Sequence, residues 1–218
     1  MKTIVIYSGG MDSTVLLYHL AEMGHKVAAL GIDYGQRHRR ELEAGKVITA
    51  RLGIEHHVAD LSALRPLLAG SSQTSEGIAV PHGHYEAESM KLTVVPNRNM
   101  LMLAVGGAWA ISRKADLIAY AAHAGDHAIY PDCREEFVRP LAEALANADW
   151  HRVDIFRPFI RMTKAEICAL GASLKVPFEL TYSCYEGREA HCGLCGTCVE
   201  RKQAFELAGI KDPTRYEA

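Results

Sequence analysis

Ile4-Val5-Ile6-Tyr7-Ser8-Gly9-Gly10-Met11-Asp12-Ser13, residues 4–13, joins a buried strand, a tight turn and the start of a helix. The apolar, β-branched run from Thr3 to Tyr7 predicts a strand that is buried on both faces, as in parallel sheets. Two adjacent glycines let the backbone turn sharply, and a helical run begins at Thr14. The free N–H groups of a first helical turn and the helix dipole favour an anion there. The stretch therefore predicts a phosphate site at the edge of an α/β sheet.

A Gly-Gly turn alone also fits a simple loop in which Asp12 or Ser13 caps the helix. The order Ser-Gly-Gly-x-Asp-Ser after a strand is more specific, and it resembles the PP-loop of the ATP pyrophosphatase superfamily. It lacks the Gly-Lys-Ser/Thr ending of a Walker A loop and the third glycine of a Rossmann fingerprint. The resemblance implies cleavage of ATP between the α- and β-phosphates. The ATP contacts that it implies in this stretch are Tyr7, Ser8, Gly9, Gly10, Met11, Asp12, Ser13 and Thr14.

Strand and helix patterns alternate along most of the chain. We expect strands at 3–7, 26–33, 54–58, 116–120 and 153–156, and helices at 14–24, 37–52, 100–112, 130–148, 163–174 and 199–207. This alternation predicts a doubly wound parallel sheet, similar to the adenine nucleotide alpha hydrolase fold, with ligands at the carboxyl ends of the strands. Residues 70–90 break the pattern, and a loop of this length predicts a mobile flap over the active site.

Composition and charge exclude several classes of function. The 218 residues are 49% hydrophobic, which suits one α/β domain with a small appendage. A formal net charge of −2 gives no basic surplus for binding nucleic acid. No apolar run reaches about 18 residues, so we expect no membrane span, and the lack of a leader peptide predicts a cytoplasmic protein. We expect residues 1–180 to form the ATP-binding domain and residues 181–218 a small metal-binding segment packed on it.

Cysteines cluster near the C-terminus with the spacing of a metal site. The cluster consists of Cys184, Cys192, Cys195 and Cys198. Two residues between thiolates turn the chain around one ion, and four thiolates suit structural Zn²⁺. A [4Fe–4S] cluster also accepts four thiolates at these spacings, so the spacing alone leaves both groups open. Disulfides do not fit a chain without a secretory signal. We expect His191 to support the cluster or lie at the surface, and Cys133 and Cys168 to be core residues.

Several segments together resemble the 7-cyano-7-deazaguanine synthases, over residues 3 to about 207. These segments are SGGMDS (8–13), DYGQRH (33–38), VVPNRN (94–99), YPDCR (130–134) and CGLCGTCVERK (192–202). The resemblance implies ATP-dependent conversion of 7-carboxy-7-deazaguanine and ammonia to the nitrile, through an acyl-adenylate and an amide, in queuosine precursor biosynthesis. It also implies ATP as a substrate with Mg²⁺, and a homodimer. Met11 is one departure, because many members carry Gln at this variable position.

The resemblance also implies roles for individual residues. Asp12 would orient or bind the Mg²⁺, and Ser13 and Arg98 would act with it in catalysis. Arg37 and Arg98 could clamp ATP phosphates or the substrate carboxylate, or form surface ion pairs instead. Asp132 could accept from the guanine-like edge of the substrate, or cap a helix. His127 could contact the substrate and relay protons, or face solvent.

Other functions stay open on the sequence alone. One is another PP-loop adenylating enzyme, such as a tRNA thiolase or a synthetase that stops at the amide. Another is a zinc-ribbon module that binds nucleic acid on a degenerate ATP fold. Turnover of ATP, product mass and bound metal separate these alternatives from the nitrile-forming enzyme.

Overall fold

The computed structural model describes residues 1–217 and contains one five-stranded sheet in the order β3-β2-β1-β4-β5. The strands are β1 (Lys2–Ile6), β2 (Lys26–Asp33), β3 (Glu55–Asp60), β4 (Leu117–Ala119) and β5 (Asp154–Phe156). Every pairing is parallel. The chain moves outward from β1 to β3 and then crosses back to β4, so the strand order reverses beside β1. Ligands of doubly wound sheets bind at such a switch point, and the predicted phosphate loop follows β1.

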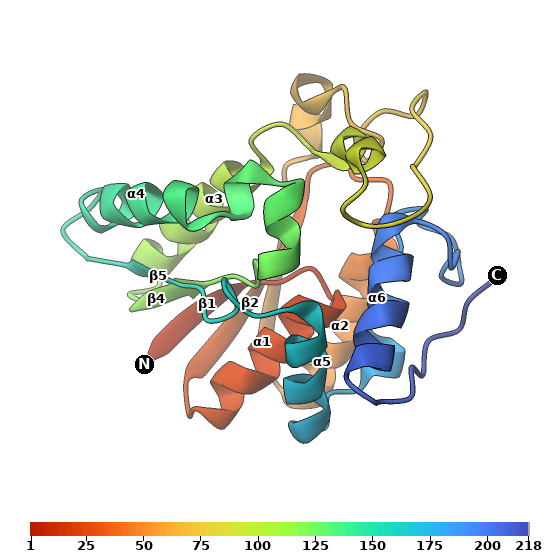
Figure 1. Cartoon of the computed structure of the whole chain (residues 1–218). Coiled ribbons are helices and arrows are strands. Elements are labelled where there is room, and N and C mark those ends of the chain that lie inside the picture. The colour runs from red at the N-terminus through yellow and green to blue at the C-terminus, as the bar shows by residue number, and fades with distance from the viewer. Residues whose placement is uncertain (218) are drawn as a thin grey trace.

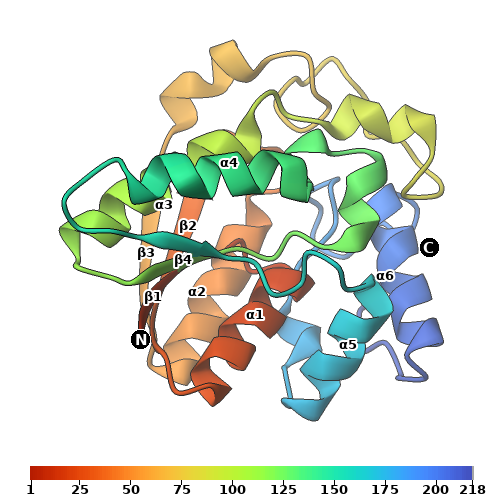
Figure 2. The same ribbon diagram turned by 60° about the vertical axis from the view of Figure 1, so that its left-hand side comes forward.

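Helices cover both faces of the sheet (Figures 1 and 2). The helices are α1 (Met11–Glu22), α2 (Arg40–Leu52), α3 (Arg98–Ser112), α4 (Glu135–Ala146), α5 (Lys164–Ser173) and α6 (Gly196–Leu207). The α3 and α4 helices lie on one face, and the other four lie on the opposite face. The predicted α/β class and parallel sheet are therefore confirmed, with helix boundaries that differ by a few residues.

Side chains of β1 point alternately into two separate hydrophobic cores. Ile4 points into the core beneath α3 and α4, whereas Val5 points into the core beneath α1, α5 and α6. This is the period of two expected of a strand that is covered on both sides. The small residues of α3 also serve packing, because a Cβ on Gly106 would lie 2.6 Å from Ile6 Cδ1. The helix can therefore lie directly against β1.

Residues 61–97 form no strand or α-helix, but they are anchored to the body. Ser71, Ser72 and Gln73 are fully buried, and the Arg37 backbone N–H donates to Gln73 O at 2.8 Å. This part is therefore packed into the protein and is not an exposed flap. The segment then arches toward the start of α6 (Figure 1), where Gly83 N–H donates to Leu194 O. Short 3₁₀ turns occur here at Ser62–Leu68 and Glu88–Thr93, and later at Ala124–Ala128, Pro131–Cys133 and Phe178–Leu180.

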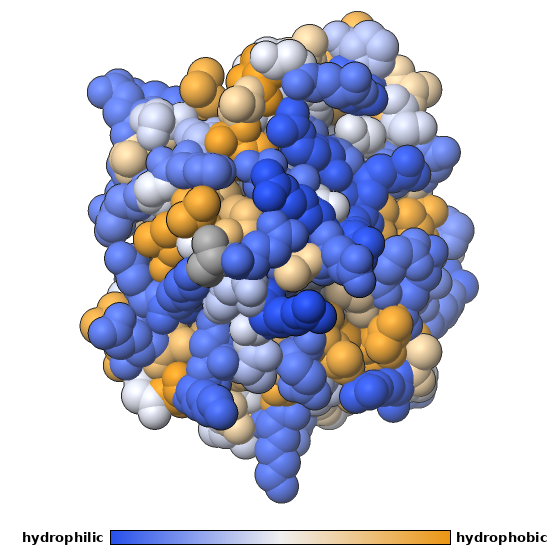
Figure 3. Space-filling model, turned by 90° about the vertical axis from the view of Figure 1, so that its right-hand side faces the viewer, coloured by the Kyte–Doolittle hydropathy of each residue, from blue (hydrophilic) through white to orange (hydrophobic). Residues whose placement is uncertain are grey.

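The C-terminal segment shares its core with the main body. Ala204 and Phe205 of α6 pack in the same cluster as Val15 of α1. The tail folds back onto the body, where Glu217 N–H donates to His191 O at 2.8 Å. Residue 218 lies outside the described residues. The face that carries this tail is mostly hydrophilic, with hydrophobic side chains in separate patches (Figure 3). No helix of residues 1–217 is long and apolar enough to cross a membrane.

Candidate active site

The 8–13 loop has the geometry of an anion cradle. Gly9 has φ +86°, and a Cβ there would lie 2.2 Å from the Glu41 carbonyl oxygen, so glycine is required. The Gly10 N–H donates to Ser8 Oγ at 3.1 Å, and Thr14 Oγ1 donates to Gly10 O at 2.8 Å. These bonds fix the turn from β1 into α1.

The first turn of α1 leaves donors free for a ligand. Its N-cap is Gly10, which has no side chain to cap the helix. Among the described residues, the backbone N–H groups of Met11, Asp12 and Ser13 have no acceptor. Unpaired N–H groups at a helix N-terminus favour a phosphate. The loop can therefore hold the charge of a pyrophosphate group.

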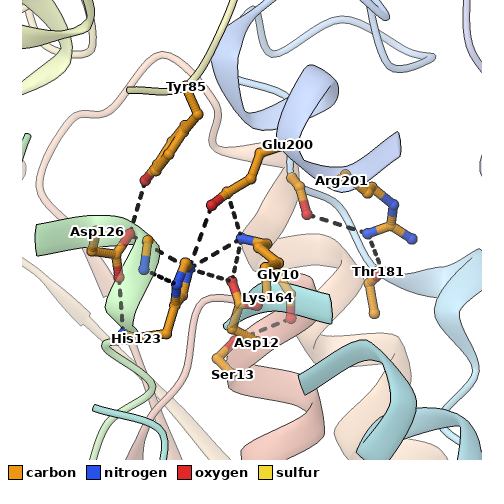
Figure 4. Close-up of polar contacts among 12 residues, drawn as sticks. Gly10, Asp12, Ser13, Tyr85, His123, Asp126, Lys164, Thr181, Glu200 and Arg201 are labelled. Carbon is orange, nitrogen blue, oxygen red and sulfur yellow. Dashed lines mark hydrogen bonds and ion pairs between the residues drawn. The ribbon is translucent and has the colours of Figure 1, made fainter. Parts of the chain in front are cut away.

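A group of charged side chains lies beside this loop (Figure 4). Lys164 Nζ lies 2.7 Å from Asp12 Oδ2 and 3.0 Å from Glu200 Oε2. His123 Nε2 lies 3.5 Å from Asp126 Oδ1 and 3.9 Å from Asp12 Oδ2. The five residues come from α1, α5, α6 and the 3₁₀ turn after β4. Packing of α5 and α6 beside α1 therefore brings distant parts of the chain to one place.

Burial and pairing set the charge states of this group. Burial by itself raises the pKa of Asp12, but Lys164 and then His123 outweigh it and lower the pKa below its ordinary value. Burial by itself lowers the pKa of Lys164, but Asp12 and then Glu200 raise it well above its ordinary value. Burial also raises the pKa of Glu200, although Lys164 opposes the shift. At neutral pH, Asp12 is therefore ionised and Lys164 is positively charged.

A cavity of about 210 Å³ opens above the loop and the charged group. Arg98, at the start of α3, lines it, and its guanidinium lies 5.6 Å from the centre of the Tyr130 ring. The Tyr130 hydroxyl is held by Thr93 Oγ1 at 2.5 Å and Tyr185 Oη at 3.2 Å. Arg98 forms no ion pair with a carboxylate of residues 1–217. The cavity therefore presents a partly buried guanidinium without an ion-paired carboxylate to a ligand.

About half of the predicted site residues line this cavity. Those that do are Ser8, Gly10, Met11, Asp12, Ser13 and Arg98. Three others build the loop from behind: Gly9 makes the turn, and the hydroxyl groups of Tyr7 and Thr14 lie 3.3 Å apart beneath it.

The remaining predicted contacts lie outside the lining of this cavity. The Arg37 guanidinium donates to the backbone carbonyls of Ser75 and Ile78, and so ties down residues 75–78. Asp132 Oδ2 accepts from the Asn99 N–H of α3 at 3.1 Å, whereas the N-cap of the helix that follows Asp132 is Arg134. The His127 carbonyl accepts from Arg134 Nε at 2.8 Å, and its ring does not reach the cavity.

Several lining residues were not assigned to the site from the sequence. They are Tyr34, Glu41, Tyr85, Asp126, Lys164, Tyr182, Ser183 and Tyr185. Lys164 lies in the first turn of a predicted helix, where Thr163 and Glu166 form a capping box. Asp126 follows β4, at the same edge of the sheet as the 8–13 loop. Of these residues, it is the one whose place in the cavity the sequence could have indicated.

The four clustered cysteines are placed so that they could hold a metal ion. Their sulfur atoms all lie within 4.8 Å of one another, and all four residues are buried and free of disulfides. Cys192 Sγ lies 3.9 Å from Cys198 Sγ. A tetrahedron with Zn–S bonds of about 2.3 Å has edges of about 3.8 Å. In a cubane cluster the thiolates bind different irons at outer corners, which spreads the sulfurs farther apart. The geometry therefore fits a single ion.

Backbone groups support this site and connect it to the cavity. The Cys195 and Leu194 N–H groups donate to Cys192 Sγ at 3.2 and 3.4 Å. His191 is buried and accepts from the Ser183 N–H at 3.0 Å through Nε2, so it positions the segment beside the cysteines. The same segment carries Tyr185 to the cavity wall.

Arg201 of α6 fixes the chain between the core and the cysteines. It is fully buried, donating to Phe178 O and Thr181 Oγ1, both at 2.9 Å. It also lies 3.7 Å from Asp212 of the tail. One side chain therefore joins three separate segments of the chain at the back of the site.

Comparison with known proteins gives a consistent result. The family model described as "Queuosine biosynthesis protein QueC" matches residues 2–209. The chain is 49% identical to the 7-cyano-7-deazaguanine synthase 1 of Colwellia psychrerythraea, over 99% of each chain. It is 48% identical to the 7-cyano-7-deazaguanine synthase of Brucella ovis, over 100% of this chain and 94% of that protein.

Solved structures share the fold at low sequence identity. A 4-thiouridine synthetase in complex with RNA and ATP has a TM-score of 0.56 at 14% identity, covering 95% of this chain and 50% of that one. The U34-tRNA thiolase NcsA of Methanococcus maripaludis, with its [4Fe–4S] cluster, has a TM-score of 0.53 at 16% identity, covering 95% of this chain and 65% of that one. These similarities support the predicted α/β fold.

Proposed function

The chain belongs to the QueC family of queuosine biosynthesis proteins, and on that premise we propose how its cavity performs the reaction of a 7-cyano-7-deazaguanine synthase. The enzyme is an ATP-dependent ligase that converts 7-carboxy-7-deazaguanine and ammonia to the nitrile. The observation that carries the proposal is that Arg98, which has no ion-paired carboxylate among the described residues, faces the same cavity as the free N–H groups of the 8–13 loop. A carboxylate and a phosphate chain can therefore bind side by side.

The first step is formation of an acyl-adenylate. Arg98 holds the substrate carboxylate, and the tyrosines around it pack against the deazaguanine rings. One carboxylate oxygen attacks the α-phosphorus of ATP, and the bond to the β-phosphate oxygen breaks. The N–H groups of Met11, Asp12 and Ser13 take up the charge of the departing pyrophosphate.

Asp12 and Lys164 act on the phosphates in different ways. Asp12 Oδ1 is buried without a hydrogen-bond partner among the described residues, so it can bind the Mg²⁺ that accompanies ATP. Mg²⁺ at this place would neutralise phosphate charge. Lys164 lies beside the same carboxylate, and its fixed positive charge stabilises the α-phosphate as it becomes five-coordinate.

Two further steps complete the conversion. Ammonia attacks the acyl carbon, the bond to the AMP oxygen breaks, and the amide forms. The amide oxygen then attacks the α-phosphorus of a second ATP. Loss of two N–H protons and departure of the second AMP leave the nitrile. Adenylation of the acid and adenylation of the amide both use the 8–13 loop, Asp12 and Lys164, because the reacting carbon stays in place between the two steps.

The proposal extends to the metal and to the assembly. We expect one structural Zn²⁺ at the four cysteines, because their sulfur spacing suits a single tetrahedral ion and they lie apart from Asp12 and Arg98. The free thiols suit a reducing compartment such as the cytoplasm. We also propose a homodimer, with small molecules as the substrates.

Product analysis tests this function against its rivals. Purified enzyme is incubated with 7-carboxy-7-deazaguanine, ammonium and excess Mg-ATP, and the products are identified by mass. The nitrile is the expected product. Accumulation of the amide alone would identify an amide synthetase. One zinc per chain without visible absorption is expected, whereas a brown protein would point to an iron–sulfur thiolase.

A further inference from the structure

Glu41, in the first turn of α2, is a cavity carboxyl group without a cationic partner. Its side chain is 13% exposed, and its Oε1 accepts from Gln36 Nε2 at 3.2 Å. His38 Nε2 lies 3.4 Å from the same oxygen. Burial lowers the pKa of His38 to about 3, so this imidazole is neutral, as is the Gln36 amide. Among the described residues, Glu41 Oε2 accepts no hydrogen bond. This oxygen is therefore free to contact a ligand in the cavity.

The position of Glu41 places it next to the reacting groups. Its backbone carbonyl touches Gly9, so the first turn of α2 packs directly against the phosphate loop. Its side chain lines the same cavity as Ser8 and Arg98. Burial raises the pKa of Glu41 to about 8, although Gln36 and Arg98 oppose the shift. Such a carboxyl group exchanges a proton close to neutral pH, as an effective general base does.

The reaction needs a proton acceptor at this place. Ammonium is the main form of the nitrogen substrate near neutral pH, and it has no lone pair with which to attack a carbonyl carbon. A small cation that enters the cavity is repelled by Arg98 and Lys164. Glu41 is the carboxyl group on the α2 side of the cavity, and it forms an ion pair with neither of them, although the charge of Arg98 opposes the rise of its pKa.

We propose that Glu41 binds the incoming ammonium ion and accepts its proton, so that neutral ammonia attacks the acyl-adenylate. This inference rests on the proposed function. The carboxylate takes H⁺ from NH₄⁺ and becomes a carboxylic acid. The nitrogen lone pair of NH₃ forms the C–N bond, the C–O bond to AMP breaks, and its electron pair leaves on the AMP oxygen. The extra proton on nitrogen passes to that oxygen, and Glu41 returns its proton to solvent through the cavity mouth.

The test compares Glu41→Gln with the wild-type enzyme in three assays near neutral pH. The first is ATP–pyrophosphate exchange with the 7-carboxy acid, which needs no nitrogen substrate. The second is amide formation with ammonium chloride. The third is hydroxamate formation with hydroxylamine, a nucleophile that is already neutral. We expect kcat/KM for ammonium to fall about 100-fold, which is the lower range for a positioned base, whereas exchange and hydroxamate formation keep their wild-type rates.

Glu43→Gln is the matched control, because Glu43 lies on the exposed side of the same helix turn and pairs with Lys46. Thermal unfolding shows whether each variant folds. A loss of hydroxamate formation together with amide formation, a loss of exchange, or no change in any assay would each overturn the role of Glu41. If the wild-type enzyme itself shows no exchange, the proposed function fails instead, so the two failures are distinguishable.

Discussion

Lys164 Nζ lies 2.7 Å from Asp12 Oδ2, although the two residues are 152 positions apart in the chain. The contact joins the start of α5 to the start of α1, directly beside the phosphate loop. It keeps Asp12 ionised and Lys164 charged, because each charge shifts the pKa of the other. The pair therefore presents one oxygen for a divalent cation and one ammonium group for phosphate in a fixed relation.

Asp12→Asn should abolish pyrophosphate release with little effect on folding. The amide keeps the shape of the side chain but loses the charge that binds Mg²⁺ and pairs with Lys164. Loss of one such charged contact lowers the rate by about 100-fold or more. Pyrophosphate release with acid, ammonium and Mg-ATP measures this. Glu22→Gln, at the exposed far end of α1, should behave as wild type. Wild-type turnover by Asp12→Asn would refute the assignment of this residue.

Arg98→Lys should weaken use of the acid more than use of the amide. Lysine keeps the charge but loses the bidentate donors that a carboxylate accepts. Charged hydrogen bonds of this kind contribute about 1.5–3 kcal/mol, which is about a 10- to 100-fold fall in kcat/KM. The amide intermediate carries no carboxylate, so its kcat/KM should change less. Arg113→Lys, at the other end of α3, is the control. Equal losses for acid and amide would argue against a carboxylate clamp.

Cys195→Ser should release the metal and destabilise the protein. The cysteines form a small cluster with Val80 and Tyr182 that is separate from the two main cores, so the packing of this cluster depends on the ion. A loss of several kcal/mol in a chain of this size lowers Tm by about 10 °C or more. Metal analysis and thermal unfolding report both effects. Cys168→Ala removes a buried thiol of the main core and should keep its zinc. Metal-free protein with unchanged Tm but no activity would instead make the site catalytic.

His38 should make the fold sensitive to acid. Burial, with help from Arg98, lowers its pKa to about 3 in the folded protein, from an ordinary value of 6.5. Between these values the unfolded chain binds more protons, so this contribution to stability is lost as the pH falls below 6.5. The loss is about 1.4 kcal/mol per pH unit. Urea unfolding at several pH values measures this loss. The free energy of unfolding should depend less on pH in His38→Gln than in the wild-type protein. The same pH dependence of stability in both proteins would contradict a lowered pKa of His38.

Sequence alone could predict the phosphate loop because its signals are local. A β-branched strand, two glycines and a helix start lie in one short stretch. The spacing of hydrophobic residues along the chain likewise predicts the strands and helices. The four cysteines are similar, since their spacing defines the turn around a metal. These features need no knowledge of what packs against them.

The partners of these features depend on packing, which the sequence does not show. Lys164 follows a helix cap, and from the sequence alone it could equally face solvent. Only the packing of α5 beside α1 brings it to Asp12. Arg37 and Arg98 looked alike as clamps, but Arg37 reaches the carbonyls of an aperiodic segment whose path could not be foreseen. Glu41 lies in a charge-rich helix turn, and its burial follows from the close contact with Gly9.

The fate of the carboxylate oxygens tests the central claim most directly. The acid is prepared with ¹⁸O at both carboxylate positions and converted to the nitrile, and the nucleotides are separated and weighed by mass spectrometry. If each activation is an attack on the α-phosphorus, one ¹⁸O enters each of two AMP molecules per nitrile, and pyrophosphate stays unlabelled. Label in inorganic phosphate with ADP as the nucleotide, or label lost to water, would contradict adenylation at the 8–13 loop.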